Sequence, residues 1–265
     1  MGLGGNKRDR ICIIEHVQRG FCRLCGKTDR LTKDHVPNQA AGNKGTYWKI
    51  LDNGKKEQFQ GGVTYNSLCK DCNNITGGWY GGAYTDFYRQ IANNLDLIKE
   101  GGNTPICIKD ISPLRVIKQI VTMFISVSDE HWCNSHIELR KFVAEKKSIY
   151  KKQNNFQIGL LWSGKSGHGV SGRDDIFTID GSKITQRAYT CINHPPMCFI
   201  LEHEHPHIPF VGIGADISFF IEADYEDTRT VEISSCIIEH DENSQKKIDE
   251  LYGKKAHKLF ESNAK

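Results

Sequence analysis

Two short stretches decide the fold of the first hundred residues: Phe21-Cys22-Arg23-Leu24-Cys25-Gly26 and Leu68-Cys69-Lys70-Asp71-Cys72-Asn73. Each contains a Cys-x-x-Cys pair that lies beside glycine, lysine or aspartate and not within an apolar run. Four cysteines in two such pairs are typical of a tetrahedral thiolate zinc site. Because thiolates fill all four positions of that site, none remains for water, and the expected role of the zinc is structural.

The dipeptide Asp34-His35 lies between the two pairs, and Asn73 directly follows the fourth cysteine. An acid, a histidine and an amide are the side chains needed to bind one divalent cation and activate a water molecule. Taken alone, an Asp-His dipeptide is most often a solvated turn pair; between two zinc-binding pairs, the functional interpretation is favoured. Adjacent side chains on a strand point to opposite faces, so the dipeptide needs a twist near the end of its strand.

The stretch from Cys22 to Gly78 resembles the HNH endonucleases, whose ββα-metal motif runs Cys-x-x-Cys, Asp-His, an Asn, and Cys-x-x-Cys followed by Asn or His. The resemblance implies that His35 is the general base that deprotonates a water molecule. It also implies that Asp34 and Asn73 ligate one Mg²⁺ or similar ion, which would bridge the scissile phosphate and stabilise the leaving 3′ oxygen. Asn66 is the candidate for the middle asparagine of the motif.

The resemblance therefore implies a metal-dependent endonuclease that hydrolyses phosphodiester bonds and leaves a 5′ phosphate. We expect the substrate to be DNA, in particular double-stranded DNA, in a microbial restriction, anti-phage or mobile-element system. A competing hypothesis from another class is a zinc-stabilised module that binds nucleic acid or protein without cutting it. Cleavage assays with divalent ions would separate the two hypotheses.

The basic residues of the first part are candidates for phosphate contacts: Lys33, Lys44, Lys49 and Lys70. Residues 1–100 carry 15 Lys/Arg against 10 Asp/Glu, while the whole chain has a formal net charge of +3. This distribution suits a polyanionic partner without requiring one. A solvated loop whose aromatic residues, Tyr47 and Trp48, pack on the zinc unit is the alternative interpretation, and the sequence leaves both open.

The composition is that of a globular protein: the 265 residues are 38% hydrophobic and 25% charged, which argues against disorder. The first residues lack the apolar core of a signal peptide, and no stretch has the roughly 18 continuous apolar residues of a membrane span. We therefore expect a cytoplasmic protein. Six further cysteines are expected to be reduced core thiols: Cys12, Cys107, Cys133, Cys191, Cys198 and Cys236.

The expected fold class is α+β, with a zinc-stabilised ββα-metal domain over residues 1–102 and an α+β accessory domain over residues 103–265. Expected helices cover residues 8–19, 83–99, 113–125 and 244–260, and a further helix begins near the second cysteine pair. The Gly-rich segment 77–82 separates that helix from the next. Expected strands cover residues 31–36, 47–51, 156–162, 176–179, 184–192, 197–201, 217–222 and 230–238.

Residues 103–265 receive no catalytic role, and recognition, regulation or partner binding stay open for them. A homodimer is reasonable, because a double-strand break by a nuclease with one site per chain needs two sites. His203, His205 and His207 lie on alternate residues and could chelate a transition metal. A histidine-rich surface loop between two strands is the favoured interpretation of that cluster.

Overall fold

The computed structural model describes residues 19–50, 56–94, 96, 105–150, 156–163, 169–180, 183–203, 215–234 and 237–238. The helices expected over residues 8–19 and 244–260 therefore lie outside the described residues. Within the described residues, helices combine with sheets whose strand pairs are antiparallel except for one short parallel pair. The fold class is α+β, as the sequence predicts.

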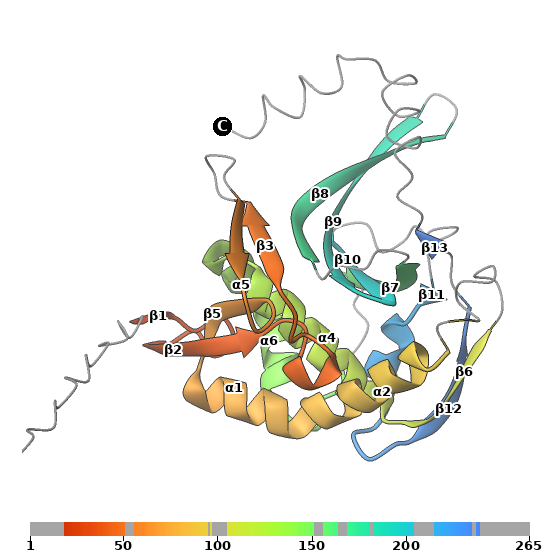
Figure 1. The fold of residues 1–265 in the computed structure, drawn as a ribbon, viewed down its shortest axis with the longest axis horizontal. Helices are drawn as coiled ribbons and strands as arrows, with labels where there is room; N and C mark the ends of the chain where they lie inside the picture. Colours follow the sequence, from red (N-terminus) through yellow and green to blue (C-terminus); the bar gives the residue numbers. More distant parts are fainter. Residues whose placement is uncertain are drawn as a thin grey trace, which may run out of the picture.

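The four-cysteine part is built on a small antiparallel sheet with the strand order β1-β2-β5 (Figure 1). These strands are β1 (Arg19–Phe21), β2 (Thr28–His35) and β5 (Thr64–Cys69). The strand expected over residues 31–36 corresponds to the second half of β2. Helix α1 (Lys70–Thr76) begins directly after β5, as expected near the second cysteine pair. Strands β2 and β5 and helix α1 thus form a strand-strand-helix unit.

An insertion separates β2 from β5. It contains the 3-10 helix η1 (Gln39–Ala41) and a hairpin of β3 (Tyr47–Ile50) and β4 (Lys56–Phe59), which projects away from the small sheet (Figure 1). The fully buried Asn43 closes its base. Its amide nitrogen donates to the carbonyl oxygens of Pro37 (2.6 Å) and Val63 (2.9 Å), and its Oδ1 accepts from the Val63 N–H (2.8 Å).

A long helical stretch follows, made of α1, the π-helical turn η2 (Gly77–Gly81) and α2 (Gly82–Ala92). The predicted break at the glycines is wrong, since the backbone stays right-handed helical at Gly77, Gly81 and Gly82. Tyr80 within η2 is fully buried and donates its hydroxyl to the Val143 carbonyl at 2.7 Å. Burial of this aromatic side chain offsets the low helix propensity of glycine.

Helix α4 (Pro113–Val127) lies at the centre of the core, and 13 of its 15 residues are buried. It confirms the helix expected over residues 113–125, although the Ser112 side chain makes no capping hydrogen bond. It packs against β5, α2 and η2, and also against α6 (Ile137–Ala144) and the 3-10 helix η3 (Ser218–Glu222). Two shorter helices follow it, α5 (Glu130–Ser135) and α6 (Ile137–Ala144).

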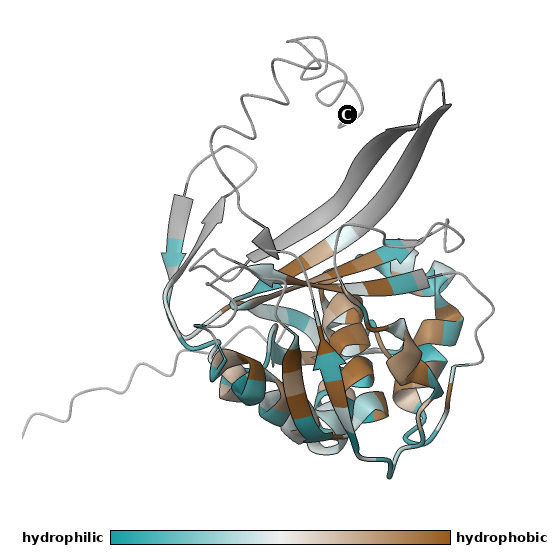
Figure 2. Cartoon of the chain, turned by 90° about the vertical axis from the view of Figure 1, so that its right-hand side faces the viewer, coloured by the Kyte–Doolittle hydropathy of each residue, from teal (hydrophilic) through white to brown (hydrophobic). Residues whose placement is uncertain are grey.

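A larger sheet lies across these helices, with the order β11-β7-β10-β9-β8 and β13 beside β7. Figure 2 shows its apolar residues meeting the apolar sides of the helices, where Trp162 and Phe199 are fully buried. The strands of this sheet are β7 (Phe156–Ser163), β8 (Gly169–Asp180), β9 (Lys183–His194), β10 (Met197–His203), β11 (Ala215–Asp216) and β13 (Ile237–Ile238). Strands β7, β8, β9 and β10 confirm the strands expected over residues 156–162, 176–179, 184–192 and 197–201.

The strand expected over residues 217–222 is wrong, because this segment forms the 3-10 helix η3 (Ser218–Glu222). The Asp216 side chain accepts a hydrogen bond from the Ser218 N–H at 2.8 Å, and the Ser218 hydroxyl accepts one from the Ile158 N–H at 2.8 Å. The bond between Ser218 and Asp216 is local and competes with strand pairing, whereas the bond from Ile158 joins this segment to β7. Phe220 is fully buried, whereas the neighbouring Phe219 is half exposed.

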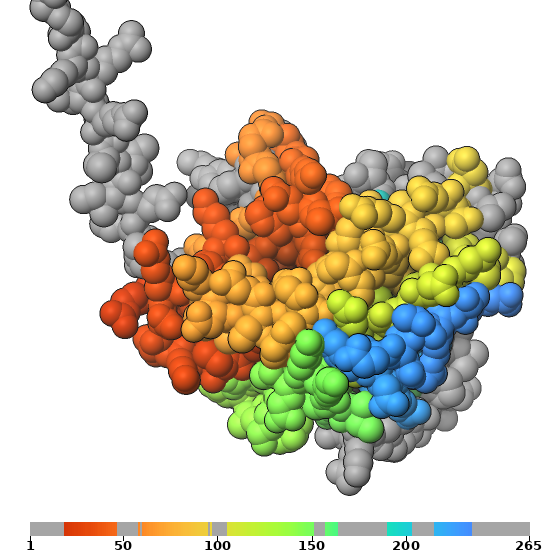
Figure 3. All heavy atoms as spheres, turned by 90° about the horizontal axis from the view of Figure 1, so that it is seen from below, coloured from red at the N-terminus to blue at the C-terminus, as the bar shows by residue number. Residues whose placement is uncertain are grey.

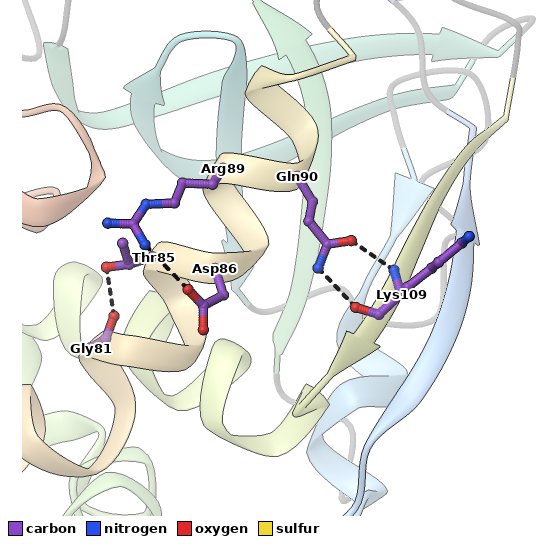
Figure 4. A network of polar contacts seen from close by, with 6 residues as sticks. All are labelled: Gly81, Thr85, Asp86, Arg89, Gln90 and Lys109. Carbon is purple, nitrogen blue, oxygen red and sulfur yellow. Dashed lines mark hydrogen bonds and ion pairs between the residues drawn. The ribbon is translucent and has the colours of Figure 1, made fainter.

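A two-stranded ribbon of β6 (Ile106–Ile111) and β12 (Arg229–Ile233) flanks helix α2. Figure 4 shows the link between them: the Gln90 side chain donates to the Lys109 carbonyl and accepts from the Lys109 N–H, both at 2.8 Å. The Gln90 side-chain amide thus makes the two hydrogen bonds to Lys109 that the backbone of a neighbouring strand would make. Cys107 on β6 is exposed, so its expected burial is wrong, while Cys133 and Cys198 are buried and Cys191 is partly buried.

One cluster of buried side chains runs from Cys22 to Ile233 and includes residues on both sides of the predicted boundary near residue 103. Seen from below, α1 and α2 lie side by side with segments 137–150 and 215–234 (Figure 3), where the Tyr225 hydroxyl donates to the Trp79 carbonyl at 3.1 Å. The domain boundary itself stays a prediction. Across the described residues, no helix has the length and apolar character needed to cross a membrane.

Candidate metal centre and adjacent polar site

The four paired cysteines come together in space. The sulfur atoms of Cys22, Cys25, Cys69 and Cys72 all lie within 4.8 Å of one another. Cys22 and Cys25 lie on the turn after β1, Cys69 ends β5, and Cys72 lies in the first turn of α1. Three of the four are buried and Cys25 is exposed. Four convergent sulfurs of this kind are compatible with a structural zinc site, as the sequence predicts.

The backbone of the first pair wraps around its sulfurs. The Gly26 N–H donates to the Cys22 carbonyl at 2.8 Å, and Gly26 has a φ of 78°, the left-handed conformation that glycine adopts without strain. A Cβ there would lie 2.3 Å from Nη2 of Arg140, so the position also needs the space that glycine leaves. The Cys69 N–H points to the Cys22 sulfur at 3.3 Å, which favours the thiolate.

The sulfurs also influence one another. A hydrogen bond from the Cys72 thiol, more than any other contact, lowers the pKa of Cys22 to about 4, while the same contact and burial raise the pKa of Cys72. Burial raises the pKa of Cys25. A thiolate at Cys22 surrounded by three further sulfurs is a favourable arrangement for a bound cation, which removes the remaining thiol protons on binding.

Asp34 contacts helix α4, which belongs to the second part of the chain, residues 103–265. Its Oδ2 accepts a hydrogen bond of 2.5 Å from the Ser126 hydroxyl near the end of α4. Burial raises the pKa of Asp34 to about 6, and the hydrogen bond from Ser126 opposes that rise. Its Oδ1 takes no part in this contact, so one carboxylate oxygen can still bind a hard cation.

His35 ends strand β2 on the opposite face from Asp34, as strand alternation requires. Its Nε2 lies 3.2 Å from the Gly61 carbonyl oxygen, at the base of the insertion. Asn66 lies directly across the ladder from Lys33, which is two residues from His35, and so shares the face of His35. The structure therefore brings Asn66 near the His35 side of the sheet and not the Asp34 side.

Asn73 joins helix α1 to strand β2. Its amide nitrogen donates to the Thr32 hydroxyl and to the Lys33 carbonyl, both at 3.1 Å. These two bonds orient the Asn73 amide group. Both use the amide nitrogen, so neither involves the amide oxygen, which is the atom that a hard cation would bind. Asn73 thus lies against the backbone immediately before Asp34-His35. A carboxylate and an amide oxygen fit a hard divalent cation.

The four predicted phosphate-binding lysines divide into two pairs. Lys33 on β2 and Lys70 at the start of α1 are exposed beside the candidate site. Lys44 is exposed within the insertion, and Lys49 lies on β3. The roles of these lysines, and of Asp34, His35, Asn66 and Asn73 in catalysis, stay predictions.

The sequence interpretation missed three residues that hold the site together: Ser126, Arg140 and Arg23. The Arg140 side chain donates to the Leu24 carbonyl at 2.9 Å, and its guanidinium carbon lies 5.4 Å from the centre of the Phe21 ring. Arg23 donates through its guanidinium to the Ser126 carbonyl. No local pattern marks these residues, because their partners are 103 and 116 positions away along the chain.

The histidine cluster of the second part lies largely outside the described residues, which end at His203 in this region. His194 is described and fully buried. Its Nδ1 lies 2.6 Å from the Tyr84 hydroxyl and its Nε2 lies 2.6 Å from the Ala41 carbonyl oxygen. This histidine therefore links β9 to α2 and to the insertion, and it is a structural residue.

Comparison of the chain with protein-family models, with curated proteins and with solved structures gave no match. The chain itself provides a four-cysteine cluster compatible with zinc, beside a strand and a helix that carry Asp34, His35 and Asn73.

Proposed function

We propose that the chain is a metal-dependent HNH endonuclease of the ββα-metal type, which hydrolyses phosphodiester bonds in nucleic acid, with double-stranded DNA as the proposed substrate. One observation carries the proposal. Asn73, directly after the fourth cysteine, is hydrogen-bonded to the strand residue that precedes Asp34-His35, within the strand-strand-helix unit of β2, β5 and α1. The order of the motif residues and the order strand, strand, helix in this unit are thus both those expected of a ββα-metal motif.

Each side chain has a distinct role in this proposal. A Mg²⁺ or similar ion, when bound, would stabilise the charge that develops on the phosphate and the leaving oxygen. Asp34 and Asn73 would hold that ion through one oxygen each. His35 would accept the proton of the attacking water through its imidazole. Lys33 and Lys70, which are exposed beside the site, would bind neighbouring phosphates of the substrate.

The proposed setting is a microbial restriction, anti-phage or mobile-element system, with zinc as the structural metal. The resemblance of the motif supports this setting, and the cluster of Cys22, Cys25, Cys69 and Cys72 supports the zinc. A double-strand break would require two such sites, which makes a homodimer or a partner bound through residues 103–265 part of the proposal.

A second candidate function is a zinc-stabilised binding module without cleavage activity. The contact between His35 Nε2 and the Gly61 carbonyl favours it, because a general base must be able to turn this nitrogen toward a water molecule. The two candidates differ in one observable property. The nuclease cuts in the presence of a divalent ion, whereas the module binds in a salt-dependent way and leaves the substrate intact under every ion.

The test is conversion of supercoiled plasmid to nicked and linear forms by zinc-loaded protein with Mg²⁺ or Mn²⁺. Asn73→Ala should reduce the rate by about 100-fold or more if its oxygen holds the ion. Asn74→Ala, at the exposed neighbouring position, is the matched control and should cut like wild type. Equal rates for wild type and Asn73→Ala would exclude the proposed site, and intact plasmid under both ions would favour the binding module.

A further inference from the structure

Ser126, on helix α4, joins the second part of the chain to Asp34, a proposed metal-binding residue. It is fully buried in the penultimate position of α4, and its hydroxyl donates to Asp34 Oδ2 at 2.5 Å. A hydroxyl donor to an ionised carboxylate forms a bond of about 2.5 to 2.7 Å, shorter and stronger than one between neutral groups. The contact is therefore suited to fixing one carboxylate oxygen in place.

The same serine is held from the zinc side. Arg23, between Cys22 and Cys25, donates through its guanidinium to the Ser126 carbonyl. The last carbonyls of a helix lack intrahelical partners and favour a positive charge nearby, so Arg23 satisfies and stabilises the end of α4. The backbone N–H of Arg23 also donates to the Ser67 carbonyl at 2.9 Å, which fixes its position against β5. The cysteine cluster, α4 and Asp34 are thus joined through Arg23 and Ser126.

We propose that Ser126 is a positioning residue that orients the Asp34 carboxylate for binding a hard divalent cation. The inference rests on the proposed function, and it gives helix α4 of residues 103–265 a part in the site. By holding Oδ2, the serine leaves Oδ1 to bind the ion in a single orientation. Groups that hydrogen-bond to a metal ligand in this way change metal affinity by about 10- to 100-fold when they are removed.

The test measures Mn²⁺ binding to the zinc-loaded full chain by titration calorimetry, a readout that needs no cleavage. Ser126→Ala should weaken Mn²⁺ binding by about tenfold or more at unchanged zinc content. Ser128→Ala is the matched control, since the Ser128 hydroxyl, within the part of the chain that the structure describes, donates to the Phe124 carbonyl of α4 and not to Asp34, and this variant should bind like wild type. Ser126→Cys, which keeps a weak donor in a similar volume, should lose less affinity than Ser126→Ala and serves if the alanine variant does not fold.

The outcomes separate the inference from the proposed function. Wild-type affinity in both Ser126 variants would overturn the positioning role and leave the nuclease proposal standing. If Ser126→Ala and Ser128→Ala both weakened Mn²⁺ binding to the same extent, the positioning role would also be overturned, because the effect would then come from the end of helix α4 in general. Absence of Mn²⁺ binding to the wild-type protein would overturn both the ion site of the proposed function and the inference that depends on it.

Discussion

Arg140 shows how a single side chain from α6 stabilises the first cysteine pair. Its guanidinium bonds the Leu24 carbonyl between Cys22 and Cys25 and occupies the space that Gly26 leaves. A buried cation that bonds a backbone carbonyl in this way contributes about 1.5 to 3 kcal/mol. The cysteine spacing is visible in the sequence, whereas the contact with Arg140 depends on tertiary packing and is not.

We expect Arg140→Met to release zinc to a competing chelator faster than wild type, because Leu24 then loses the partner that fixes the turn. Lys141→Met is the control: Lys141 is exposed and bonds only Glu138 of its own helix. The measurement is the rate of zinc transfer to a chromophoric chelator. Equal transfer rates for the two variants would mean that Arg140 packs beside the turn without stabilising it.

Lys118 is a buried lysine that stabilises the end of α6. Its Nζ donates to the Glu145 carbonyl at 2.6 Å and the Lys146 carbonyl at 3.2 Å, and it lies 4.6 Å from the centre of the Phe142 ring. Burial lowers the pKa of Lys118 to about 7, against the opposing effect of Glu145. Helical periodicity places residue 118 on α4 but does not reveal that this cationic group is inside the core.

This lowered pKa predicts a pH-dependent stability. Between about pH 7 and about pH 10.5 the unfolded lysine binds a proton that the folded one has released, so the free energy of unfolding decreases as pH falls across this interval, and the loss is complete at about pH 7. Relative to Lys118→Met, the free energy of unfolding of wild type should rise between about pH 7 and about pH 9, by at most about 1.4 kcal/mol per pH unit. Urea unfolding measures it, and a difference independent of pH would contradict it.

Most helices and strands are predicted by the sequence, whereas conformations that depend on contacts between residues far apart along the chain are not. Alternation and apolar runs predict β2, β3, β7 and β10, and helical spacing predicts α4. The predicted helix break at the glycines of η2 and the predicted strand over the residues of η3 are wrong for the same reason. Their conformations depend on partners such as Val143 for Tyr80 and Ile158 for Ser218, which lie far along the chain.

The insertion between β2 and β5 offers a matched pair of glycines. Gly61 and Gly62 have φ values of 89° and 93°, but a Cβ at Gly61 meets nothing within 4 Å, whereas one at Gly62 would lie 2.2 Å from the Asn43 carbonyl oxygen. Gly61→Ala should cost about 1 to 2 kcal/mol for the left-handed backbone alone, and Gly62→Ala should cost more. Thermal unfolding of both variants measures this, and equal losses would exclude close packing around Asn43.

At the scale of the whole molecule, the continuous core indicates that the two predicted parts unfold together. Buried residues from Cys22 to Ile233 belong to one cluster, and α4 packs against both β5 and η3. The sequence predicts a boundary near residue 103 from a change in composition. A change in composition does not show how the two sides pack, because helix α4 could bury its apolar face against either part.

Zinc removal tests this coupling. Cys69→Ser should forfeit much of a metal-binding free energy on the order of 10 kcal/mol that is coupled to folding, and residues 20–80 should unfold. Since α4 packs against this region, the melting temperature of the whole chain should fall with it, in one calorimetric transition. A second transition that is unchanged in Cys69→Ser would show that residues 103–265 fold independently.

A comparison of plasmid cleavage and zinc content in wild type and His35→Ala tests whether His35 is the general base. His35 makes one described polar contact, to the Gly61 carbonyl, and none with the cysteine cluster among the described residues. We expect His35→Ala to keep its zinc and its melting temperature but to lose cleavage by about 100-fold or more. Undiminished cleavage by a zinc-loaded His35→Ala protein would contradict the claim that this histidine, within the zinc-supported strand-strand-helix unit, is the general base.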